Sequence, residues 1–406
     1  MSEQKNILGN ILGDSRLLPQ EERLAVSFEK KSITIGIPKE RYYSERRIVI
    51  VPSAAAMLVE SGNRVLIERG AGVDANFPDV LYSEAGAEIV DNKEEVFKCD
   101  VVVKIVPPSL AELSMMRDKT ILISALNISG QRREFFKKLI SKKITALSYE
   151  HIRDKDDSHP VLHSISEIVG NAAVLIGAEY LSDSKWGRGK MLGGFTGINP
   201  SEVVIVGAGT VGENAARAAL GFGALVKIFD NSLGKLSRIQ SNLGGRVYTS
   251  IIQPDVLSKA LLTADVVIGA MYPVRGRNNL VITEEMVRNM KKGSVLVDVS
   301  IDRGGCSETS RETGHDDPVY SLFGVTHYCV PNISSRTPHT SSYALSNFMG
   351  PLLTELGEAG GLIRLLMTRK GVRDGVYSFK GHIVMEDIAD FFNLHFYSLD
   401  LLLASY

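Results

Sequence analysis

The fold is decided by the stretch Ser201-Glu-Val-Val-Ile-Val-Gly-Ala-Gly-Thr-Val-Gly212, which is followed by Val226-Lys-Ile-Phe-Asp230. Residues 203–206 are all apolar and β-branched, a pattern typical of a parallel strand that is buried on both faces. Glycines come directly after this strand and open a helix that we predict over residues 213–222. Because a second apolar strand then ends in a carboxylate, the order is strand, glycines, helix, strand and acid.

Each glycine in this order has a separate physical task. Gly207 allows a tight turn, Gly209 lets the backbone approach a pyrophosphate, and Gly212 lets the helix pack on the strand. The helix N-terminus, where Thr210 and Val211 stand, offers free N–H groups and a positive dipole end to phosphates. A glycine-rich turn alone is a weak signal, but in this context it predicts a dinucleotide-binding site.

The carboxylate at the end of the second strand predicts which nucleotide binds. Asp230 in this position would accept hydrogen bonds from the adenosine ribose and repel a 2′-phosphate. Asn231, Ser232 and Leu233 follow it, so no arginine is adjacent in the sequence. We therefore expect NAD rather than NADP.

Composition excludes several classes of protein. The chain has 406 residues, of which 44% are hydrophobic and 23% charged, which suggests two or three globular domains. A formal net charge of −1 gives no electrostatic basis for nucleic-acid binding. Cys99, Cys306 and Cys329 are scattered, so we expect neither a disulfide framework nor a metal site. The N-terminus lacks the apolar region of a signal peptide, and no stretch approaches the roughly 20 apolar residues of a membrane span. We expect a cytoplasmic protein.

Short strands and helices alternate from residue 32 onward. We predict strands at residues 33–38, 64–68, 88–90, 101–106, 120–126 and 144–149, then at 266–270, 294–298 and 326–330, with helices such as 54–61 and 132–140 between them. This alternation predicts α/β architecture with two doubly wound, Rossmann-like parallel sheets and a cleft between the domains. A helix over residues 343–367 is expected to return to the first domain. The expected division is an extension at 1–32 with helices at 5–12 and 19–28, a discontinuous substrate domain at 33–160 plus 339–406, and an NAD-binding domain at 161–338.

Several motifs outside the glycine loop resemble the alanine dehydrogenase/pyridine nucleotide transhydrogenase (N-terminal part) family. The resemblance extends from about residue 33 to the C-terminus. The late motifs look like the alanine dehydrogenase branch. The motifs are Gly36-Ile-Pro-Lys-Glu40, Gly70-Ala-Gly72, Ala85-Gly-Ala-Glu-Ile-Val90, Ser166-Glu-Ile-Val-Gly170, Val297-Asp-Val-Ser-Ile-Asp-Arg-Gly-Gly-Cys306, His327-Tyr-Cys-Val-Pro-Asn332 and Thr340-Ser-Ser-Tyr-Ala-Leu345.

The resemblance implies a set of substrate and catalytic residues, two of which have changed. In active alanine dehydrogenases, it implies, an Arg and a Lys hold the substrate carboxylate while a His and an Asp transfer protons. Arg47 and Asp302 match the Arg and the Asp. The Lys has become Val106 and the His has become Asn127, which cannot take a proton at neutral pH. A lost base costs roughly 10²–10⁴-fold in rate, so alanine oxidation by the usual mechanism should be very slow or absent.

Other residues keep two readings open. Lys104 is either a displaced carboxylate ligand or a strand-end lysine in solvent. Arg336 and His339 are either replacements for the missing charge or, more plausibly, residues of a surface loop, and His315 is interpreted as a structural loop residue. Ser166 either contacts the cofactor, as the resemblance implies, or caps the helix predicted from residue 166 to 181.

The predicted site therefore combines the glycine-loop argument with the family resemblance. Asp302 and Asn127 are the candidate catalytic residues, and Arg47, Lys104 and Asn127 bind the substrate. The cofactor-binding set is Ser166, Gly207, Gly209, Thr210, Val211, Gly212, Asp230, Asn231, Asp302 and Asn332.

Two functions from different classes fit these residues. The first is NAD-dependent oxidative deamination of L-alanine or a related small amino acid to the 2-oxo acid, with an altered substrate site. The second is an NAD(H)-binding protein without dehydrogenase activity, acting as a sensor or as a transhydrogenase-like partner subunit. Apolar residues of the helix at 166–181 and the family resemblance also predict a homo-oligomer, a hexamer or a dimer.

Overall fold

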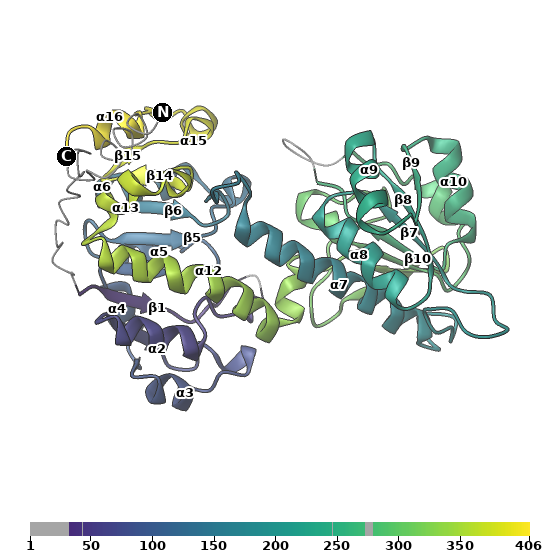
Figure 1. Ribbon diagram of the computed structural model, residues 1–406, viewed down its shortest axis with the longest axis horizontal. Helices are drawn as coiled ribbons and strands as arrows, with labels where there is room; N and C mark the ends of the chain where they lie inside the picture. The colour runs from purple at the N-terminus through teal and green to yellow at the C-terminus, as the bar shows by residue number, and fades with distance from the viewer. Residues whose placement is uncertain (1–31, 43, 246, 273–278) are drawn as a thin grey trace, which may run out of the picture.

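The computed structural model describes residues 32–406 except 43, 246 and 273–278. Its described residues form two α/β lobes, one with an eight-stranded and one with a seven-stranded sheet (Figure 1). The helices predicted at 5–12 and 19–28 lie outside the described residues. The predicted fold class is confirmed, and it gives the chain two separate sheets whose edges can face each other.

The first lobe is built on strands from both ends of the described chain. Its sheet has the order β15-β14-β6-β5-β4-β1-β2-β3. Strands β1 to β6 are parallel, as predicted, whereas β14 and β15 join antiparallel at one edge, which the sequence analysis did not predict. The strands are β1 (Thr34–Ile37), β2 (Arg64–Glu68), β3 (Glu88–Val90), β4 (Val101–Val103), β5 (Ile121–Ser124), β6 (Thr145–Ser148), β14 (Val376–Phe379) and β15 (His382–Ile383).

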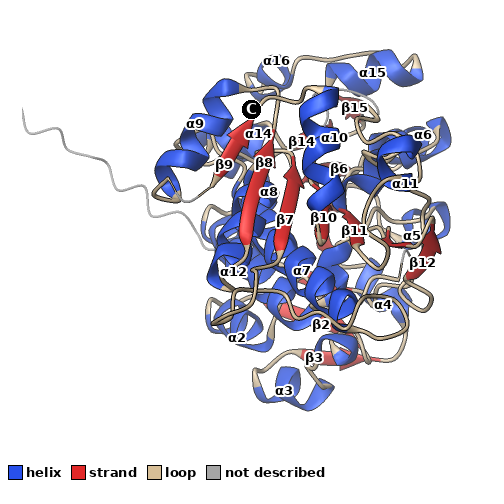
Figure 2. Cartoon of the chain, turned by 90° about the vertical axis from the view of Figure 1, so that its right-hand side faces the viewer, coloured by secondary structure: helices blue, strands red, loops and turns tan. Residues whose placement is uncertain are grey.

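The second lobe contains the glycine loop. Its sheet has the order β12-β13-β11-β10-β7-β8-β9, parallel except for β12, and helices lie on both faces (Figure 2). Residues 266–269 of β10 pair in parallel with residues 203–206 of β7, and all of these paired residues are buried. The strands are β7 (Glu202–Val206), β8 (Leu225–Phe229), β9 (Tyr248–Ser250), β10 (Val266–Gly269), β11 (Val295–Asp298), β12 (Val319–Leu322) and β13 (Val325–Tyr328).

Shorter helices cover the two sheets. They are α2 (Pro52–Glu60), α3 (Asp79–Glu84), α4 (Lys93–Phe97), α5 (Leu110–Met115), α6 (Arg133–Ser141), α8 (Thr210–Gly221), α9 (Leu233–Asn242), α10 (Pro254–Thr263), α11 (Glu284–Arg288), α13 (Leu362–Thr368), α14 (Lys370–Arg373), α15 (Glu386–Phe392) and α16 (Leu399–Leu403), with 3₁₀ turns η1 (Val73–Ala75), η2 (Ile128–Gly130), η3 (Val299–Arg303) and η4 (Ile333–Arg336).

Two long helices connect the lobes and correct the sequence prediction. Helix α7 (Pro160–Ser182) runs from one lobe to the other, and α12 (Pro338–Glu358) packs against it (Figure 1). Proline begins α7 at its first turn, so Ser166 lies inside the helix and the reading of Ser166 as its cap is wrong. The single helix predicted at 343–367 is two helices, because the positive φ angles of Gly360 and Gly361 break it before α13.

The apolar character of α7 also needs a correction. Among the described residues, this helix is long and apolar enough to cross a membrane by length and composition, contrary to the prediction that no stretch comes close. That is weak evidence, because α7 packs against α8 and much of its apolar face is buried in the chain. Val169, Ala172 and Ile176, which were expected to need a partner subunit, are already covered, whereas Leu175 remains 54% exposed.

Candidate functional site

The glycine loop has the geometry that a bound pyrophosphate requires. Gly207 has φ +118°, and a Cβ there would lie 2.3 Å from the Ala270 carbonyl oxygen. A Cβ on Gly212 would meet the Gly207 carbonyl at 1.9 Å, so only glycine allows this packing. A Cβ on Gly209, in contrast, would meet nothing within 4 Å. The open space therefore lies at the N-cap of α8, where helix N–H groups favour phosphate.

The ribose end of this loop is built around Asp230. Its carboxylate accepts hydrogen bonds from the backbone N–H groups of Ala208 at 2.7 Å and Ser232 at 2.8 Å. Two cations that the linear sequence did not place here come from α9. Lys235 Nζ lies 4.0 Å from Asp230, and Arg238 donates to the Ala208 carbonyl at 3.2 Å. These cations make the surroundings of the carboxylate less acidic than Asp230 alone suggests.

A hydrogen-bond chain joins the two lobes at the predicted substrate residues. The Arg47 guanidinium is 8% exposed and binds Glu45 through Nε at 2.7 Å and Nη2 at 2.6 Å. Asn332 donates from Nδ2 to Glu45 at 2.9 Å and from its backbone N–H to Asp302 at 3.2 Å. Asn332 holds both from a left-handed backbone conformation at φ +54°. Sequence reasoning missed Glu45, although it stands two residues before Arg47.

The electrostatics of this chain differ between its ends. Burial of the carboxyl raises the pKa of Asp302 to about 6 although the residue keeps exposed surface, and the Asn332 N–H and the charges of Arg303 and Arg47 oppose the rise. At the other end, Arg47 lowers the pKa of Glu45, so that carboxylate stays ionised in spite of its burial. Asp302 can therefore exchange a proton near neutral pH, while Glu45 serves as a fixed anion.

Lys104 is buried in the first lobe and does not point into solvent. It is fully buried, and its Nζ lies 3.0 Å from Glu40 and 3.5 Å from Glu112. Glu40 also accepts from the Ile105 N–H at 2.6 Å, and Glu112 caps α5 through Ser109. The reading as a solvent lysine is wrong, because the ammonium neutralises two buried carboxylates.

The two substituted positions lie near the carboxyl ends of β4 and β5. Val106 is buried in the core of the first lobe beyond β4. Asn127 is exposed, adopts φ +43° and precedes η2. Ligands of open α/β sheets bind at the carboxyl ends of the strands, so Asn127 stays a substrate-site candidate, with an amide in place of a base.

The remaining candidates are distributed as follows. Ser166 lies half-buried on α7. Arg336 ends η4 and pairs with Glu179, while His339 lies in the first turn of α12, stacked on Phe77 at a centroid distance of 4.7 Å. Both therefore lie in helical turns rather than in a loop. His315 lies in a loop, as predicted, and its Nε2 is a buried atom without a hydrogen-bond partner in the described chain.

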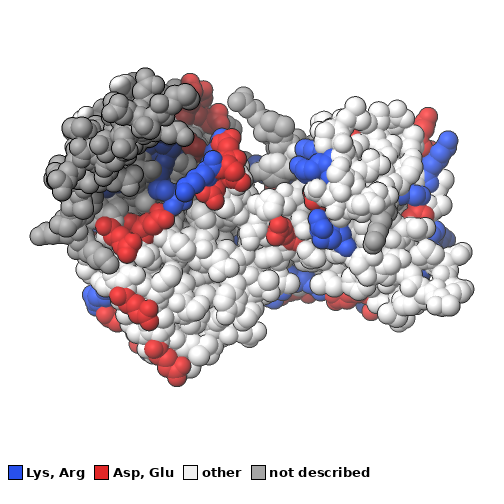
Figure 3. Space-filling model, in the orientation of Figure 1, with Lys and Arg blue, Asp and Glu red and all other residues white. Residues whose placement is uncertain are grey.

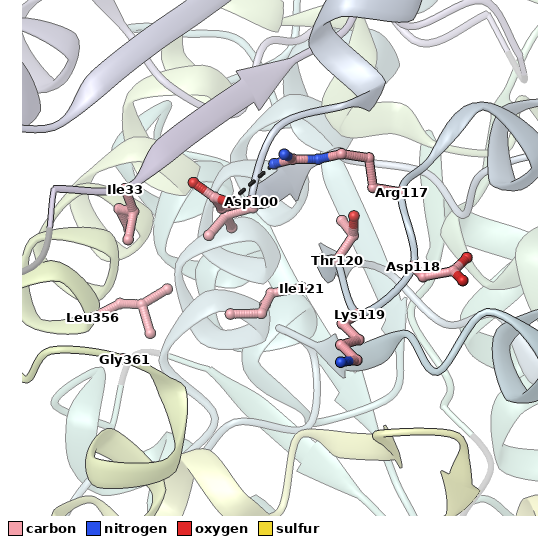
Figure 4. Close-up of a pocket in the computed structure, with 10 residues that line it drawn as sticks. Ile33, Asp100, Arg117, Asp118, Lys119, Thr120, Ile121, Leu356 and Gly361 are labelled. Atoms are coloured by element: carbon pink, nitrogen blue, oxygen red, sulfur yellow. Dashed lines mark hydrogen bonds and ion pairs between the residues drawn. The ribbon is translucent and has the colours of Figure 1, made fainter.

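Surface hollows lie in three places. Figure 3 shows the surface notched between the two lobes, in agreement with the predicted cleft. A cavity of about 450 Å³ lies between α7, α8 and α9 beside the glycine loop, lined by Thr210 and Arg238 among others. Another, of about 320 Å³, lies at the amino ends of β1, β4 and β5, where Arg117 pairs with Asp100 (Figure 4). This 320 Å³ cavity therefore lies at the opposite ends of the strands from Val106 and Asn127.

The fold and the site together define a protein of two doubly wound domains with a dinucleotide loop in the second. The alanine dehydrogenase/PNT N-terminal domain family matches residues 36–169, and the C-terminal domain family matches residues 173–386. The chain belongs to the alanine dehydrogenase/PNT family, as its motifs predicted.

Individual relatives agree with this assignment. Alanine dehydrogenase 2 of Staphylococcus aureus strain Mu50 is 36% identical over 367 residues, which are 90% of this chain and 98% of the relative. The solved structure of an L-alanine dehydrogenase has a TM-score of 0.83 at 36% identity and covers 89% of this chain and 99% of that one. A transhydrogenase from Sinorhizobium meliloti shares the fold, with a TM-score of 0.73 at 23% identity over 87% of this chain and 99% of that one.

Proposed function

We propose that the chain is an NAD-dependent dehydrogenase that oxidatively deaminates L-alanine or a related small amino acid to the 2-oxo acid, through an altered substrate site. The observation that carries this proposal is the chain Arg47–Glu45–Asn332–Asp302. It joins a carboxylate-binding cation of the first lobe to a titratable carboxylate of the second. Nearly complete coverage of alanine dehydrogenase relatives supports the same function.

The residues would divide the work as follows. Glu45 occupies Nε and Nη2 of Arg47, which leaves Nη1 for a substrate carboxylate. Asp302 would hold or release a proton near neutral pH. The nucleotide, when bound on the glycine loop, would accept the hydride from the substrate Cα. Val106 leaves Arg47 without a second cation, so we expect weaker binding of the substrate carboxylate.

A turnover screen tests this proposal. The unmodified protein is given NAD and, separately, L-alanine, glycine, L-serine and L-2-aminobutyrate at alkaline pH, and NADH absorbance is followed. We expect at least one substrate to give NADH. The matched control is Gly209→Val, whose Cβ would stand in the open space of the loop with nothing of the protein within 4 Å, and which should abolish both NADH binding and turnover. No turnover with any amino acid, alongside intact NADH binding, would reject the dehydrogenase.

That outcome would favour the second candidate, an NAD(H)-binding protein without dehydrogenase activity. It is favoured by what the family resemblance implies, namely that Asn127 stands in place of a base and Val106 in place of a cation. A sensor or partner subunit needs only the glycine loop and Asp230, both of which keep binding geometry. NADH fluorescence titration without amino-acid turnover is its expected signature.

The finer features of the proposal are the cofactor, location and assembly. We propose NAD over NADP because of Asp230, a cytoplasmic location, and the domain boundaries at residues 160 and 338. We also propose a homo-oligomer, a hexamer or a dimer, but on another surface than α7. Gly193 and Gly194 lie against the Phe222 backbone. The same region exposes the apolar side chains of Met191, Phe195, Ile198, Phe222 and Leu225.

A further inference from the structure

The carboxyl edge of the first sheet carries a histidine next to the substituted position. Ser124 of β5 and Ser148 of β6 are partners in parallel register. Asn127 and His151 each stand three residues beyond these partners. Neighbouring strands are about 4.8 Å apart, so the two residues leave adjacent strands at equivalent positions. The histidine absent at 127 thus has a counterpart one strand away.

Hydrogen bonds hold the two strand ends together. The Tyr149 N–H donates to the Ser124 carbonyl at 3.3 Å, which continues the ladder past the strands. Glu150 accepts from the Leu126 N–H at 3.1 Å, directly before Asn127. These bonds fix the loop that carries His151 relative to the loop that carries Asn127.

The His151 ring is oriented for proton transfer. Its Nδ1 lies 2.9 Å from the hydroxyl of the buried Ser148. In the tautomer whose Nδ1–H donates to the Ser148 hydroxyl, the lone pair is on Nε2, to which no described residue makes a hydrogen bond. A base held by a third group through its other nitrogen is the arrangement that nucleophile-activating sites use.

The charged groups around His151 come from both lobes. Burial lowers its pKa, as do His159 at the start of α7 and Arg303 from η3, while Glu150 and Asp387 of α15 raise it. Arg303 directly follows Asp302, so the field of the second lobe reaches this histidine. The imidazole is therefore neutral at the pH where a base must accept a proton.

We propose that His151 is the proton-transfer residue of this site and replaces the base that Asn127 cannot supply. This rests on the proposed function. After hydride leaves Cα, water adds to the iminium carbon and the C=N π pair moves to nitrogen. His151 Nε2 takes the water proton and passes it to that nitrogen. His151 then takes the hydroxyl proton while the C–N bond breaks, and the electron pair of that bond leaves on ammonia. His151 finally passes the hydroxyl proton to ammonia, which becomes ammonium.

The test compares His151→Gln with a matched His395→Gln, an exposed histidine that packs on Tyr397. We expect His151→Gln to lower kcat by about 100-fold or more, to remove the acid limb of the kcat–pH profile, and to leave NADH affinity unchanged. His395→Gln should change none of these. Adding Asn127→His to His151→Gln should restore kcat at least tenfold.

A readout without turnover keeps the inference testable if a variant does not fold. In the unmodified protein with labelled histidines, pyruvate added to the NADH complex should shift the His151 ring resonances and leave those of His395 in place. Full activity and an unchanged pH profile in His151→Gln, or no shift of the His151 resonances, would overturn the role of His151 and leave the proposed function standing. No turnover by the unmodified protein would instead overturn the proposed function and the inference with it.

Discussion

Replacing Lys104 should destabilise the protein rather than impair substrate binding directly. The variant Lys104→Met keeps the length of the side chain but removes its charge from a fully buried position. At an effective dielectric constant of about 20, its contacts with Glu40 at 3.0 Å and Glu112 at 3.5 Å each supply about 5 kcal/mol of attraction. Much of this attraction offsets the cost of removing the ammonium from water. Removing one partner of a buried ion pair typically lowers stability by about 3–5 kcal/mol.

Urea unfolding at pH 8 measures this loss, because the variant leaves two buried carboxyl groups without their cation. The loss should shrink at pH 5, since burial already raises the pKa of Glu40 and lets it take a proton. Adding Glu40→Gln should recover part of the stability. Lys98→Met, which removes an exposed pair with Glu94 at 3.0 Å, is the control and should cost about 0.5 kcal/mol or less. A change under about 1 kcal/mol in Lys104→Met, with KM raised tenfold, would show that Lys104 binds substrate.

Four further predictions concern other parts of the molecule. Burial lowers the pKa of His327 to about 4 from an ordinary 6.5, so the neutral ring stabilises the fold above pH 6.5 and that stability is lost as pH falls to 4. Between pH 7 and pH 4, the free energy of unfolding in urea should therefore fall by about 3 kcal/mol less in His327→Gln than in the unmodified protein. An equal fall in both proteins would contradict this. Asp230→Ala should narrow the preference for NAD over NADP in calorimetric titrations, and equal affinities in the unmodified protein would sink the cofactor assignment. The double change Asn127→His with Val106→Lys should raise alanine oxidation, followed as NADH at alkaline pH; fast alanine turnover without it would show that Asn127 is not disabling because another group, such as His151, already supplies the base. Light scattering at micromolar concentration should give an oligomeric mass that Ile198→Glu reduces, and a monomeric mass for the unmodified protein would refute the assembly.

Local patterns determined the parts of the fold that the sequence predicted correctly. The apolar run before Gly207 and the carboxylate at Asp230 are close in sequence, so their strand, turn and helix could be placed from spacing alone. The same holds for β2 and β3, whose predicted bounds match the structure. Strands β9, β12, β14 and β15 were missed; they lie at or next to a sheet edge, and polar residues such as Ser250, Ser321 and Ser378 interrupt the apolar pattern of their short segments.

The sequence named the residues of the candidate site but could not place them relative to one another. The roles of Arg47 and Asp302 came from motif resemblance, whereas the hydrogen-bond chain between them depends on Asn332, which lies 287 residues from Glu45. Lys104 was misread for the same reason, because its partner Glu40 is 64 residues away. Burial of a charged side chain depends on such distant partners, and a strand-end lysine carries no local sign of them.

The central claim is that this site moves a hydride from an amino acid to a nicotinamide nucleotide, and isotope transfer tests it most directly. The unmodified protein is incubated with NAD and with L-alanine and the related amino acids deuterated at Cα, and the nucleotide is analysed by mass spectrometry. The account predicts deuterium in NADH, formed in equal amount with the 2-oxo acid even if turnover is slow. Bound nucleotide without deuterium after incubation with every amino acid would contradict it.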